Sequence, residues 1–404
     1  MAQDDGSPRI AAKPGETSSG QAGPASGVGS GADGGAVNRA LGAAVGPGPA
    51  AAGPEDPGPE VRAVTEVVLP GLVEPSGLVV RTATRSAPGP GQAGVRVDAA
   101  GVSFAEQGMR RGRYPGQPPF PFVPGYDLVG TVTEVGAGVD PALIGRRVAA
   151  LTKTGAWTTW TVRTAADLVP VPDEVDAGKA ETVLVNGVTA WQMLHRKARV
   201  GSGAAVLVHG ANGGVGSVLV QLARHAGARV VGTAHPRHHD RLRALGVEPV
   251  DYREDGLAAR LRAVAPGGFD AVFDHLGGES FRRSFGLLRR GGTLVCYGTA
   301  AQVDAGGSVL LQFVRIFGRL AVRTVLPNGR SATFYNLWGG RRRVRRFRRR
   351  LHEDLSEVLR LLSEGVLTAH VAERFPLTQA AAAMELAESR TVLGKVVLEP
   401  QRTR

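Results

Sequence analysis

A glycine-rich segment between two apolar runs is the part of the sequence whose spacing most directly implies chemistry. Four glycines fall within seven residues: Gly210, Gly213, Gly214 and Gly216. The run before them is expected to be a strand, and a helix is expected to begin near Gly214. The free N–H groups and positive dipole end of such a helix favour an anion above the loop. With Ala211 in the first place, Gly213 and Gly216 match the later glycines of G-x-G-x-x-G, so the spacing predicts a dinucleotide pyrophosphate site.

The turn after the next apolar run bears on which dinucleotide is bound. NAD-preferring sites usually carry an Asp or Glu about 20 residues after the loop, where it holds the ribose 2′-hydroxyl. Here Gly232, Thr233 and Ala234 stand at that place, and a basic turn with Arg237 and His239 follows. A carboxylate would repel a 2′-phosphate, whereas these side chains would attract it. The sequence therefore predicts NADPH as the cofactor, with Thr233, Arg237 and His239 among its contacts.

The elements expected to position this loop form two patterns. Short alternating segments, separated by glycine and proline, run over about 61–175 and predict a mostly β domain. From about residue 204, strand-like and helix-like runs alternate, which predicts a parallel sheet with helices on both faces. A helix near 347–364 and strand-like ends follow, so we infer a β-rich domain interrupted by a cofactor domain. The predicted parts are 61–185 and 323–400 for the β-rich domain and 186–322 for the cofactor domain.

The first 60 residues have the composition of a disordered segment. They contain 14 Gly and 8 Pro and no Phe, Trp or Tyr. Such a segment buries too little apolar surface to offset the entropy lost on ordering. We therefore predict that residues 1–60 are disordered.

The basic charge of the chain is concentrated in one run. The net charge is +12, and residues 341–350 alone hold eight arginines and no acid. Such a run could contact nucleic acid or an anionic surface. No stacking-aromatic pattern accompanies it, so we expect a solvated helix start or loop and no nucleic-acid partner.

Cysteine content and hydropathy bear on the compartment. Cys296 is the single cysteine, which excludes an internal disulfide and a multi-cysteine zinc site, and we expect it to be a small buried strand residue. No apolar stretch reaches the ~20 residues that a membrane helix needs. The N-terminus lacks a signal-peptide pattern. We expect a cytosolic protein without a membrane segment.

Several segments resemble the medium-chain dehydrogenase/reductase superfamily. They include VNGVTAWQML from Val185, GANGGVGSVLVQLARHAGARVVGT from Gly210 and FDAVFDHLGGE from Phe269. Upstream, the stretch from Ala99 to Val139 resembles the zinc-independent quinone oxidoreductase branch. The likeness covers about 61–400. It implies an α/β fold in which a GroES-like β-rich domain holds an inserted, doubly wound Rossmann domain, with NADPH in the cleft between them and a homodimer as the common assembly.

The same resemblance implies that catalytic zinc is absent. Zinc enzymes of the superfamily carry Cys, and then His-Glu, where this chain has Ser103 and then Tyr126 and Asp127. A tetrahedral zinc site needs three or four suitable ligands, which these residues do not make. Without a Lewis acid, the remaining chemistry is direct hydride transfer to an electron-poor acceptor, such as a quinone or an α,β-unsaturated carbonyl.

The resemblance also implies roles for individual residues. The cleft would be lined by Ser103, Tyr114 and Tyr126, with Tyr114 as the preferred donor to the carbonyl oxygen. Asn186 and Thr189 would border the nicotinamide. The further cofactor contacts carried over by motif are Ala211, Gly213, Gly214, Val215, Gly216, Tyr252, Leu276, Gly277, Gly298 and Thr299.

Two alternatives stay open at the level of the sequence. The same loops occur in the enoyl reductase domains of polyketide synthases, so an enoyl-thioester reductase of polyketide or fatty-acid type would share them and would need a channel for a pantetheine arm. A low-turnover NADPH-binding protein would instead use the arginine run to hold RNA or another anionic partner. Its binding would weaken steeply with salt.

Overall fold

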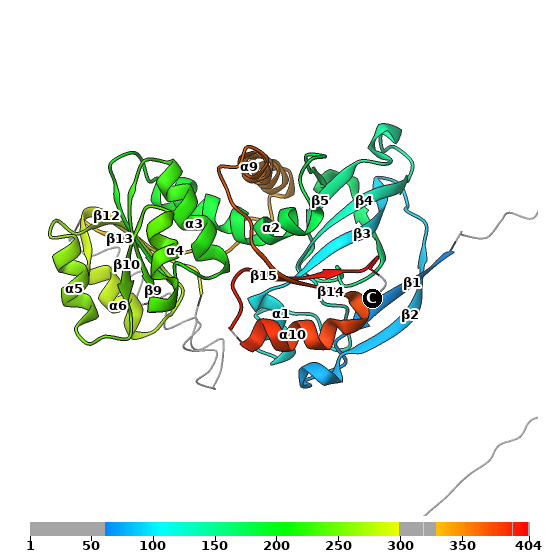
Figure 1. Cartoon of the computed structure of the whole chain (residues 1–404). Coiled ribbons are helices and arrows are strands. Elements are labelled where there is room, and N and C mark those ends of the chain that lie inside the picture. Colours follow the sequence, from blue (N-terminus) through cyan, green and yellow to red (C-terminus); the bar gives the residue numbers. More distant parts are fainter. Residues whose placement is uncertain (1–60, 299–317, 319–328, 390, 403–404) are drawn as a thin grey trace, which may run out of the picture. The chain divides into compact units, whose positions relative to one another are not determined.

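The computed structural model (Figure 1) describes residues 61–298, 318, 329–389 and 391–402. Two expectations lie outside the described residues, namely the disorder of residues 1–60 and the cofactor contact of Thr299. Among the described residues, no helix combines the length and apolar character needed to cross a membrane.

The β-rich part of the chain is built on a sheet in the order β14-β15-β3-β4-β5-β7, with β6 also paired to β3. Its strands are β3 (Gln92–Val102), β4 (Asp127–Val135), β5 (Arg147–Leu151), β6 (Trp160–Thr164), β7 (Val169–Pro170), β14 (Val371–Pro376) and β15 (Lys395–Glu399). β15 runs antiparallel to β3, with Val396 opposite Val102. The last strands of the chain complete a sheet that begins far upstream, which confirms that this domain is interrupted and resumed.

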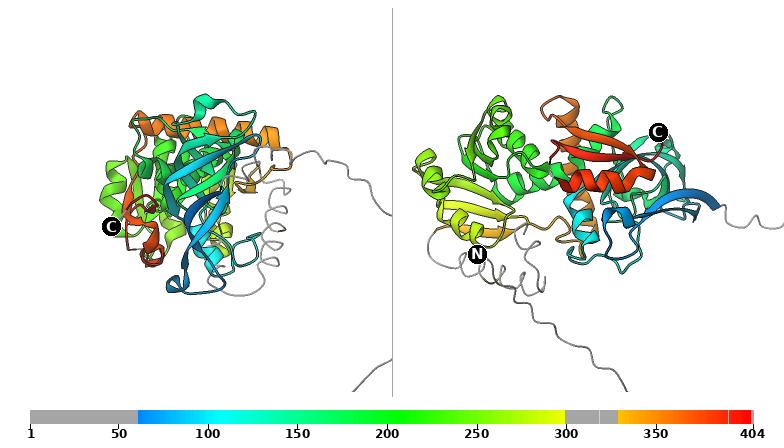
Figure 2. Two further views of the ribbon diagram at one scale, coloured as in Figure 1. Left: turned by 90° about the vertical axis from the view of Figure 1, so that its right-hand side faces the viewer. Right: turned by 60° about the horizontal axis from the view of Figure 1, so that its bottom comes forward.

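Smaller elements surround this sheet. β1 (Val61–Val68) and β2 (Val79–Ser86) form a separate antiparallel ribbon, drawn in blue in Figure 2. α1 (Phe104–Arg110) follows β3, and α10 (Ala380–Ser389) packs against β14 and β15. α2 (Ala177–Trp191) continues as a π-helical turn over Gln192–Ala198 and contacts β3, β4 and α9 (Val344–Ser363). Short 3₁₀ turns lie at Pro75–Gly77, Pro141–Leu143, Ala165–Asp167, Pro236–His238 and Leu377–Gln379.

The cofactor part is a parallel sheet in the order β10-β9-β8-β11-β12-β13. Its strands are β8 (Ala205–His209), β9 (Arg229–Ala234), β10 (Val247–Asp251), β11 (Phe269–Asp274), β12 (Leu288–Cys296) and β13 (Ser331–Phe334). The helices that connect them include α3 (Gly214–His225), α4 (His239–Ala244), α5 (Leu257–Val264) and α6 (Glu279–Gly286). The chain order reverses between β8 and β11, and doubly wound sheets bind ligands outside the strand ends at such a switch point.

Strand β8 shows why its apolar run is continuous. Val206 is buried in one cluster with Leu222 of α3, while Leu207 is buried in another with Phe285 of α6. Successive side chains of a strand point to opposite faces, so helices on both sides require apolar residues at every position. Figure 1 accordingly shows α3 and α4 on one side of this sheet and α5 and α6 on the other. The buried Cys296 at the end of β12 confirms the expectation of a small strand residue.

The parallel sheet extends beyond the border predicted at residue 322. β13 pairs in parallel with β12, with Ser331 opposite Thr293. β13 has only four residues, all partly exposed at the sheet edge, so no apolar run marked it in the sequence. The other predicted border, between residues 185 and 186, falls inside α2. The division into domains therefore stays a prediction, whereas the helix expected near 347–364 is confirmed as α9.

Candidate active site

The glycine-rich loop forms the turn between β8 and α3 at the carboxyl edge of the parallel sheet. Gly210 has φ +65, which favours glycine, and its carbonyl accepts the N–H of Gly213 at 3.0 Å. A Cβ on Gly216 would collide with that carbonyl, whereas a Cβ on Gly213 would meet only the Gly210 oxygen, at 3.3 Å. No side chain caps the N-terminus of α3, in whose first turn Val215 is partly buried. The loop thus packs tightly below and leaves bare backbone above, as a phosphate requires.

A small cavity lies beside the loop and is lined by residues from distant parts of the chain. Asn186 of α2 lines this cavity and lies against Gly214. A Cβ on Gly214 would be only 3.0 Å from the Asn186 Nδ2 atom. Arg241, His370 and Lys395 also line it, and none of the described residues around it is acidic. These three residues were not singled out in the sequence because no motif marks them. Burial and the neighbouring Arg241 lower the pKa of His370, and the Lys395 ammonium is paired with Asp127 and Glu181, so Arg241 supplies the positive charge beside the cavity.

The basic turn after β9 is arranged differently from its expected role. Thr233 is 2% exposed, and its hydroxyl accepts the N–H of Gly210 at 3.2 Å, so its side chain supports the loop from below. The His239 Nε2 atom lies 3.3 Å from the carbonyl oxygen of Ala234. Arg237 donates from Nε to Nε2 of His238 at 3.0 Å. Burial and the neighbouring Arg237 and Arg241 lower the pKa of His238. The turn is therefore cationic through its arginines.

The end of β10 brings an acid close to this turn. Asp251 lies opposite Ala234 in the sheet, and its carboxylate accepts from the backbone N–H and the guanidinium of Arg253 at 3.0–3.2 Å. The adjacent Tyr252 is 51% exposed, as its expected cofactor contact requires. Arg253 therefore neutralises the Asp251 carboxylate, which lies beside the end of β9, the place where an NAD enzyme carries its ribose ligand.

The loop after β11 lies across the switch point from the glycine-rich loop. The Asp274 carboxylate accepts the N–H of Leu276 at 2.8 Å, and Gly277 follows with φ +89. A Cβ on Gly298, just after β12, would lie 3.0 Å from the carbonyl oxygen of His275. The ends of β11 and β12 thus approach closely, which brings Leu276, Gly277 and Gly298 into one neighbourhood.

A chain of aromatic polar groups forms the second part of the site. The hydroxyl oxygens of Tyr114 and Tyr126 lie 2.6 Å apart, and the indole N–H of Trp338 donates to the Tyr126 hydroxyl. The two tyrosine rings meet edge to face, with centroids 5.9 Å apart. Burial raises the pKa of Tyr126 and of Tyr114, so both phenols stay protonated at neutral pH. Trp338 was missed because it lies 212 residues after Tyr126 in the sequence.

The direction of these hydrogen bonds bears on which hydroxyl is available. Trp338 can only donate, so the Tyr126 oxygen accepts its hydrogen bond. Either tyrosine hydroxyl can donate in the bond between them, and when Tyr126 donates, the Tyr114 proton points away from Tyr126. Tyr114 is partly exposed, whereas Tyr126 is buried. The arrangement therefore leaves Tyr114 as a donor at the end of the chain.

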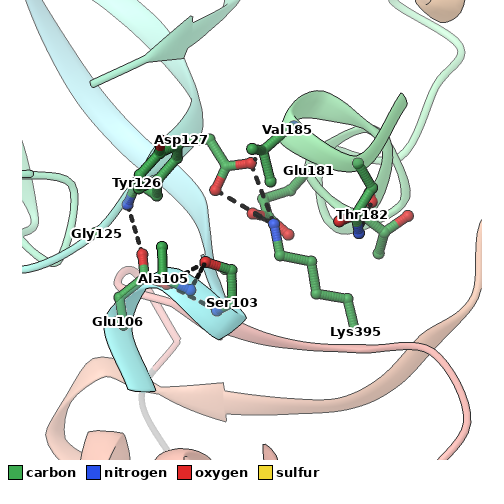
Figure 3. Close-up of polar contacts among 12 residues, drawn as sticks. Ser103, Ala105, Glu106, Gly125, Tyr126, Asp127, Glu181, Thr182, Val185 and Lys395 are labelled. Atoms are coloured by element: carbon green, nitrogen blue, oxygen red, sulfur yellow. Dashed lines mark hydrogen bonds and ion pairs between the residues drawn. The ribbon is translucent and has the colours of Figure 1, made fainter. Parts of the chain in front are cut away.

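Ser103 has a structural task in the fold. It caps α1 in a capping box with Glu106, whose carboxylate accepts both the N–H and the hydroxyl of Ser103. The other oxygen of Glu106 accepts the N–H of Tyr126 at 2.6 Å, as Figure 3 shows. Burial raises the pKa of Glu106. Ser103 thus positions Tyr126 through Glu106, and its own hydroxyl is already engaged.

Asp127 takes part in a buried ion cluster. The Lys395 ammonium lies 3.1 Å from the Asp127 carboxylate and 2.6 Å from that of Glu181, and Asp127 also accepts the N–H of Val185 at 3.1 Å (Figure 3). The opposing carboxylates raise the pKa of Lys395 despite the cost of burial. The cluster ties β15 and β4 to α2, the helix that carries Asn186 and the buried Thr189. Among the described residues, no group of three or more His, Cys, Asp and Glu could hold a metal ion.

The arginine run lies at the start of α9. Arg348 pairs with Asp167 at 2.6 Å, Arg350 donates to the Gly339 carbonyl at 3.0 Å, and the Arg341 guanidinium lies 5.4 Å from the Trp338 ring centroid. These three arginines contact the protein itself, whereas Arg342, Arg343, Arg345 and Arg346 are exposed, as in the expected solvated helix start.

Comparisons with known proteins point to dehydrogenases and reductases. Residues 89–173 match the alcohol dehydrogenase GroES-like domain, and residues 245–398 match the zinc-binding dehydrogenase family. The chain is 32% identical over 337 residues to a 2-haloacrylate reductase of Burkholderia sp, covering 81% of this chain and 96% of that protein. It is 31% identical over 330 residues to the human synaptic vesicle membrane protein VAT-1 homolog, with 79% and 82% covered. A Mycobacterium tuberculosis mycocerosic acid synthase-like polyketide synthase is 32% identical over 322 residues, which are 78% of this chain and 14% of that one.

Solved structures share the fold. A mycobacterial quinone oxidoreductase has a TM-score of 0.69 at 29% identity, covering 83% of this chain and all (100%) of that one. A mycobacterial protein complexed with NADPH has a TM-score of 0.69 at 28% identity with the same coverage. The resumed β-rich domain, the doubly wound sheet and its glycine-rich loop define an oxidoreductase with a nicotinamide dinucleotide site. Within that class, the chain belongs to the medium-chain dehydrogenase/reductase superfamily, in the branch of the quinone oxidoreductases.

Proposed function

We propose that the protein transfers a hydride from NADPH to a quinone or an α,β-unsaturated carbonyl without a metal ion. The hydrogen-bonded chain from Trp338 through Tyr126 to Tyr114 carries the proposal, because it presents a protonated hydroxyl in the domain that the family uses for its substrate. The quinone oxidoreductase and 2-haloacrylate reductase relatives support it.

The residues around the glycine-rich loop fit the cofactor. When bound, NADPH supplies the hydride. The bare backbone of Gly213 and Gly214 and the uncapped α3 would hold its pyrophosphate, with Arg241 as a counter-charge. Asn186 and Thr189 would border the nicotinamide, and the cationic turn at Arg237 would favour the 2′-phosphate.

The tyrosine chain would act on the substrate oxygen. Negative charge develops on a carbonyl oxygen when the conjugated system accepts a hydride, and a fixed donor stabilises that charge. Tyr114 would donate its proton toward this oxygen, while Tyr126 and Trp338 hold the Tyr114 hydroxyl in one orientation. The product takes up a proton from Tyr114, and solvent then restores the Tyr114 proton.

The test is an NADPH-oxidation assay with 1,4-benzoquinone, 9,10-phenanthrenequinone, a simple enone and crotonyl-CoA, each with and without EDTA. We expect turnover of a quinone or the enone, unaffected by the chelator. Loss of activity with EDTA, together with one zinc ion per chain, would contradict the metal-free mechanism.

An enoyl-thioester reductase is the second candidate, favoured by the similarity to a polyketide synthase. Selective turnover of crotonyl-CoA would establish it. We also propose that the protein is cytosolic and forms a homodimer, the assembly that the family resemblance implies. Light scattering tests the assembly.

A further inference from the structure

The two loops that flank the switch point are joined below by a line of buried polar side chains. On one side, Thr233 accepts the N–H of Gly210 at 3.2 Å and lies 3.2 Å from Nδ1 of His209. On the other side, Nε2 of His209 lies 3.0 Å from the hydroxyl of Ser284. Ser284 donates to the Asp274 carboxylate at 2.7 Å, and the same carboxylate accepts the N–H of Leu276 at 2.8 Å.

Every side chain of this line is shielded from water. His209, Thr233, Asp274 and Ser284 are each 4% exposed or less. They come from β8, β9, β11 and α6, the elements that converge beneath the proposed pyrophosphate site. A buried polar group left without a partner costs more than a hydrogen bond contributes, so the line tolerates few alternative arrangements.

The donors and acceptors of the line can be assigned from chemistry. Asp274 as a carboxylate only accepts, so Ser284 uses its proton there and its oxygen must accept from His209. His209 is then protonated at Nε2, and its bare Nδ1 accepts the proton of Thr233. The Thr233 oxygen stays available for the N–H of Gly210. Burial lowers the pKa of His209, although the nearby Asp274 opposes this and Arg283 adds to it. The neutral ring is therefore favoured.

We infer that His209, as the neutral Nε2–H tautomer, is a positioning residue that couples the glycine-rich loop to the loop at Leu276 and Gly277. Through it, the two loops take up the cofactor as one unit. The inference rests on the proposed cofactor site and adds to it a residue that need not touch the cofactor.

A double-mutant cycle on the full chain tests the coupling, with the NADPH Kd measured by fluorescence titration. Thr233→Val and Ser284→Ala each cut one end of the line, and each should weaken binding about tenfold. The NADPH Kd of the double variant should not exceed the higher of the two single-variant Kd values, because either substitution alone already uncouples the loops. Thr233→Ser keeps the hydroxyl and should bind NADPH within about twofold of wild type. Thr158→Val is the matched control, because it removes the hydroxyl of a buried threonine in the β-rich domain that donates to the Trp160 carbonyl, and it should also bind NADPH within about twofold of wild type.

The outcomes separate this inference from the proposed function. His209→Asn is a second probe, because its amide oxygen can replace Nδ1 while the bond to Ser284 is lost, and it should bind like Ser284→Ala. If wild type binds NADPH but the two cuts act additively, or His209→Asn and Ser284→Ala bind as wild type does, the coupling is refuted and the proposed function stands. If wild type does not bind NADPH, the proposed function fails and this inference fails with it. Melting temperatures without ligand show whether each variant is folded.

Discussion

The glycine-rich loop and the tyrosine chain are two parts of one site that are built in opposite ways. The loop offers backbone groups from a few consecutive residues, and its glycines serve by lacking side chains. The chain of Tyr114, Tyr126 and Trp338 offers side-chain hydrogens from segments far apart in the sequence. A backbone site fails when something is added to it, whereas a side-chain site fails when one polar atom is removed. Substitutions of each kind can therefore test the comparison.

The largest effect is expected from adding volume to the loop. Gly213→Val should weaken NADPH binding by more than about 100-fold, because the valine methyls would occupy the place of a phosphate oxygen that accepts several hydrogen bonds. Gly213 has φ −73, which valine adopts without strain, and a Cβ there would make one tight contact, 3.3 Å from the Gly210 carbonyl oxygen, which a shift of a few tenths of an ångström would relieve. Circular dichroism should therefore show a folded protein. The matched control is Gly201→Val, at a glycine with open space just before β8. Binding within threefold of wild type by the Gly213 variant would place the pyrophosphate elsewhere.

A smaller effect is expected from removing one hydroxyl from the tyrosine chain. Tyr114→Phe should lower kcat for an enone about 100-fold and leave the NADPH Kd unchanged, since the lost donor acts on the substrate oxygen. Trp338→Phe should lower kcat less, because Tyr114 keeps its proton and loses only its orientation. Tyr335→Phe, which removes a buried hydroxyl bonded to Gln192, is the control. An unchanged kcat in the Tyr114 variant would show that solvent alone protonates the product.

The basic turn should have a more moderate effect on cofactor choice. Wild type should bind NADPH more tightly than NADH. Arg237→Glu should lower the ratio of the NADH Kd to the NADPH Kd about tenfold, and not more, because charges near the surface are screened by solvent and salt. Arg241→Glu is the companion variant, because Arg241 lines the cavity beside the loop. Fluorescence titrations with both cofactors decide the matter. Equal affinity of wild type for the two would rule out NADPH selectivity.

The tyrosine chain should make the rate insensitive to alkaline pH. Burial raises the pKa of Tyr114 and Tyr126, and a phenol with a raised pKa keeps its proton to higher pH than a free tyrosine, which ionises near 10. We therefore expect kcat/KM for the enone to stay level from pH 7 to about 10. A fall in kcat/KM with a midpoint at or below pH 10 that disappears in Tyr114→Phe would show that Tyr114 titrates as if exposed.

The smallest effect is expected from deleting residues 1–60, which precede both the glycine-rich loop and the tyrosine chain. Removing residues 1–60 should leave turnover unchanged. It should shift the melting temperature by no more than a few degrees, which corresponds to about 1 kcal/mol in a chain of this size. The segment contains 14 Gly and 8 Pro and has little apolar surface to contribute. A larger drop in the melting temperature would mean that it packs on the rest of the chain.

The backbone half of the site was predictable because its signal is local. The spacing of Gly213 and Gly216 between an apolar run and a helix fixed the loop, and the alternating strands and helices predicted the doubly wound sheet. The resumed β-rich domain followed from strand-like segments at the end. The four-residue β13 at the sheet edge was missed because so short and exposed a strand has no period to detect.

The side-chain half could be predicted only in part. The resemblance indicated Tyr114 and Tyr126, but their mutual contact and the donor Trp338 depend on how distant segments pack. Thr233 and Ser103 illustrate the same limit. Their hydroxyls looked available in the sequence, yet one supports the loop at Gly210 and the other caps α1. Burial, which decides such roles, is not a property of a motif.

The place of β15 in the sheet has a consequence for the order of events on the ribosome. Val102 of β3 pairs with Val396, which is synthesised much later. The buried carboxylates of Asp127 and Glu181 likewise lack the ammonium of Lys395 until the end of synthesis. At bacterial or eukaryotic elongation rates, roughly tens of seconds separate the synthesis of these partners. The parallel sheet can form during that interval, while the first domain is held with an open strand edge and uncompensated acids. A chaperone would therefore be needed while the β-rich domain is incomplete. Its sheet is completed only when β15 emerges and pairs with β3.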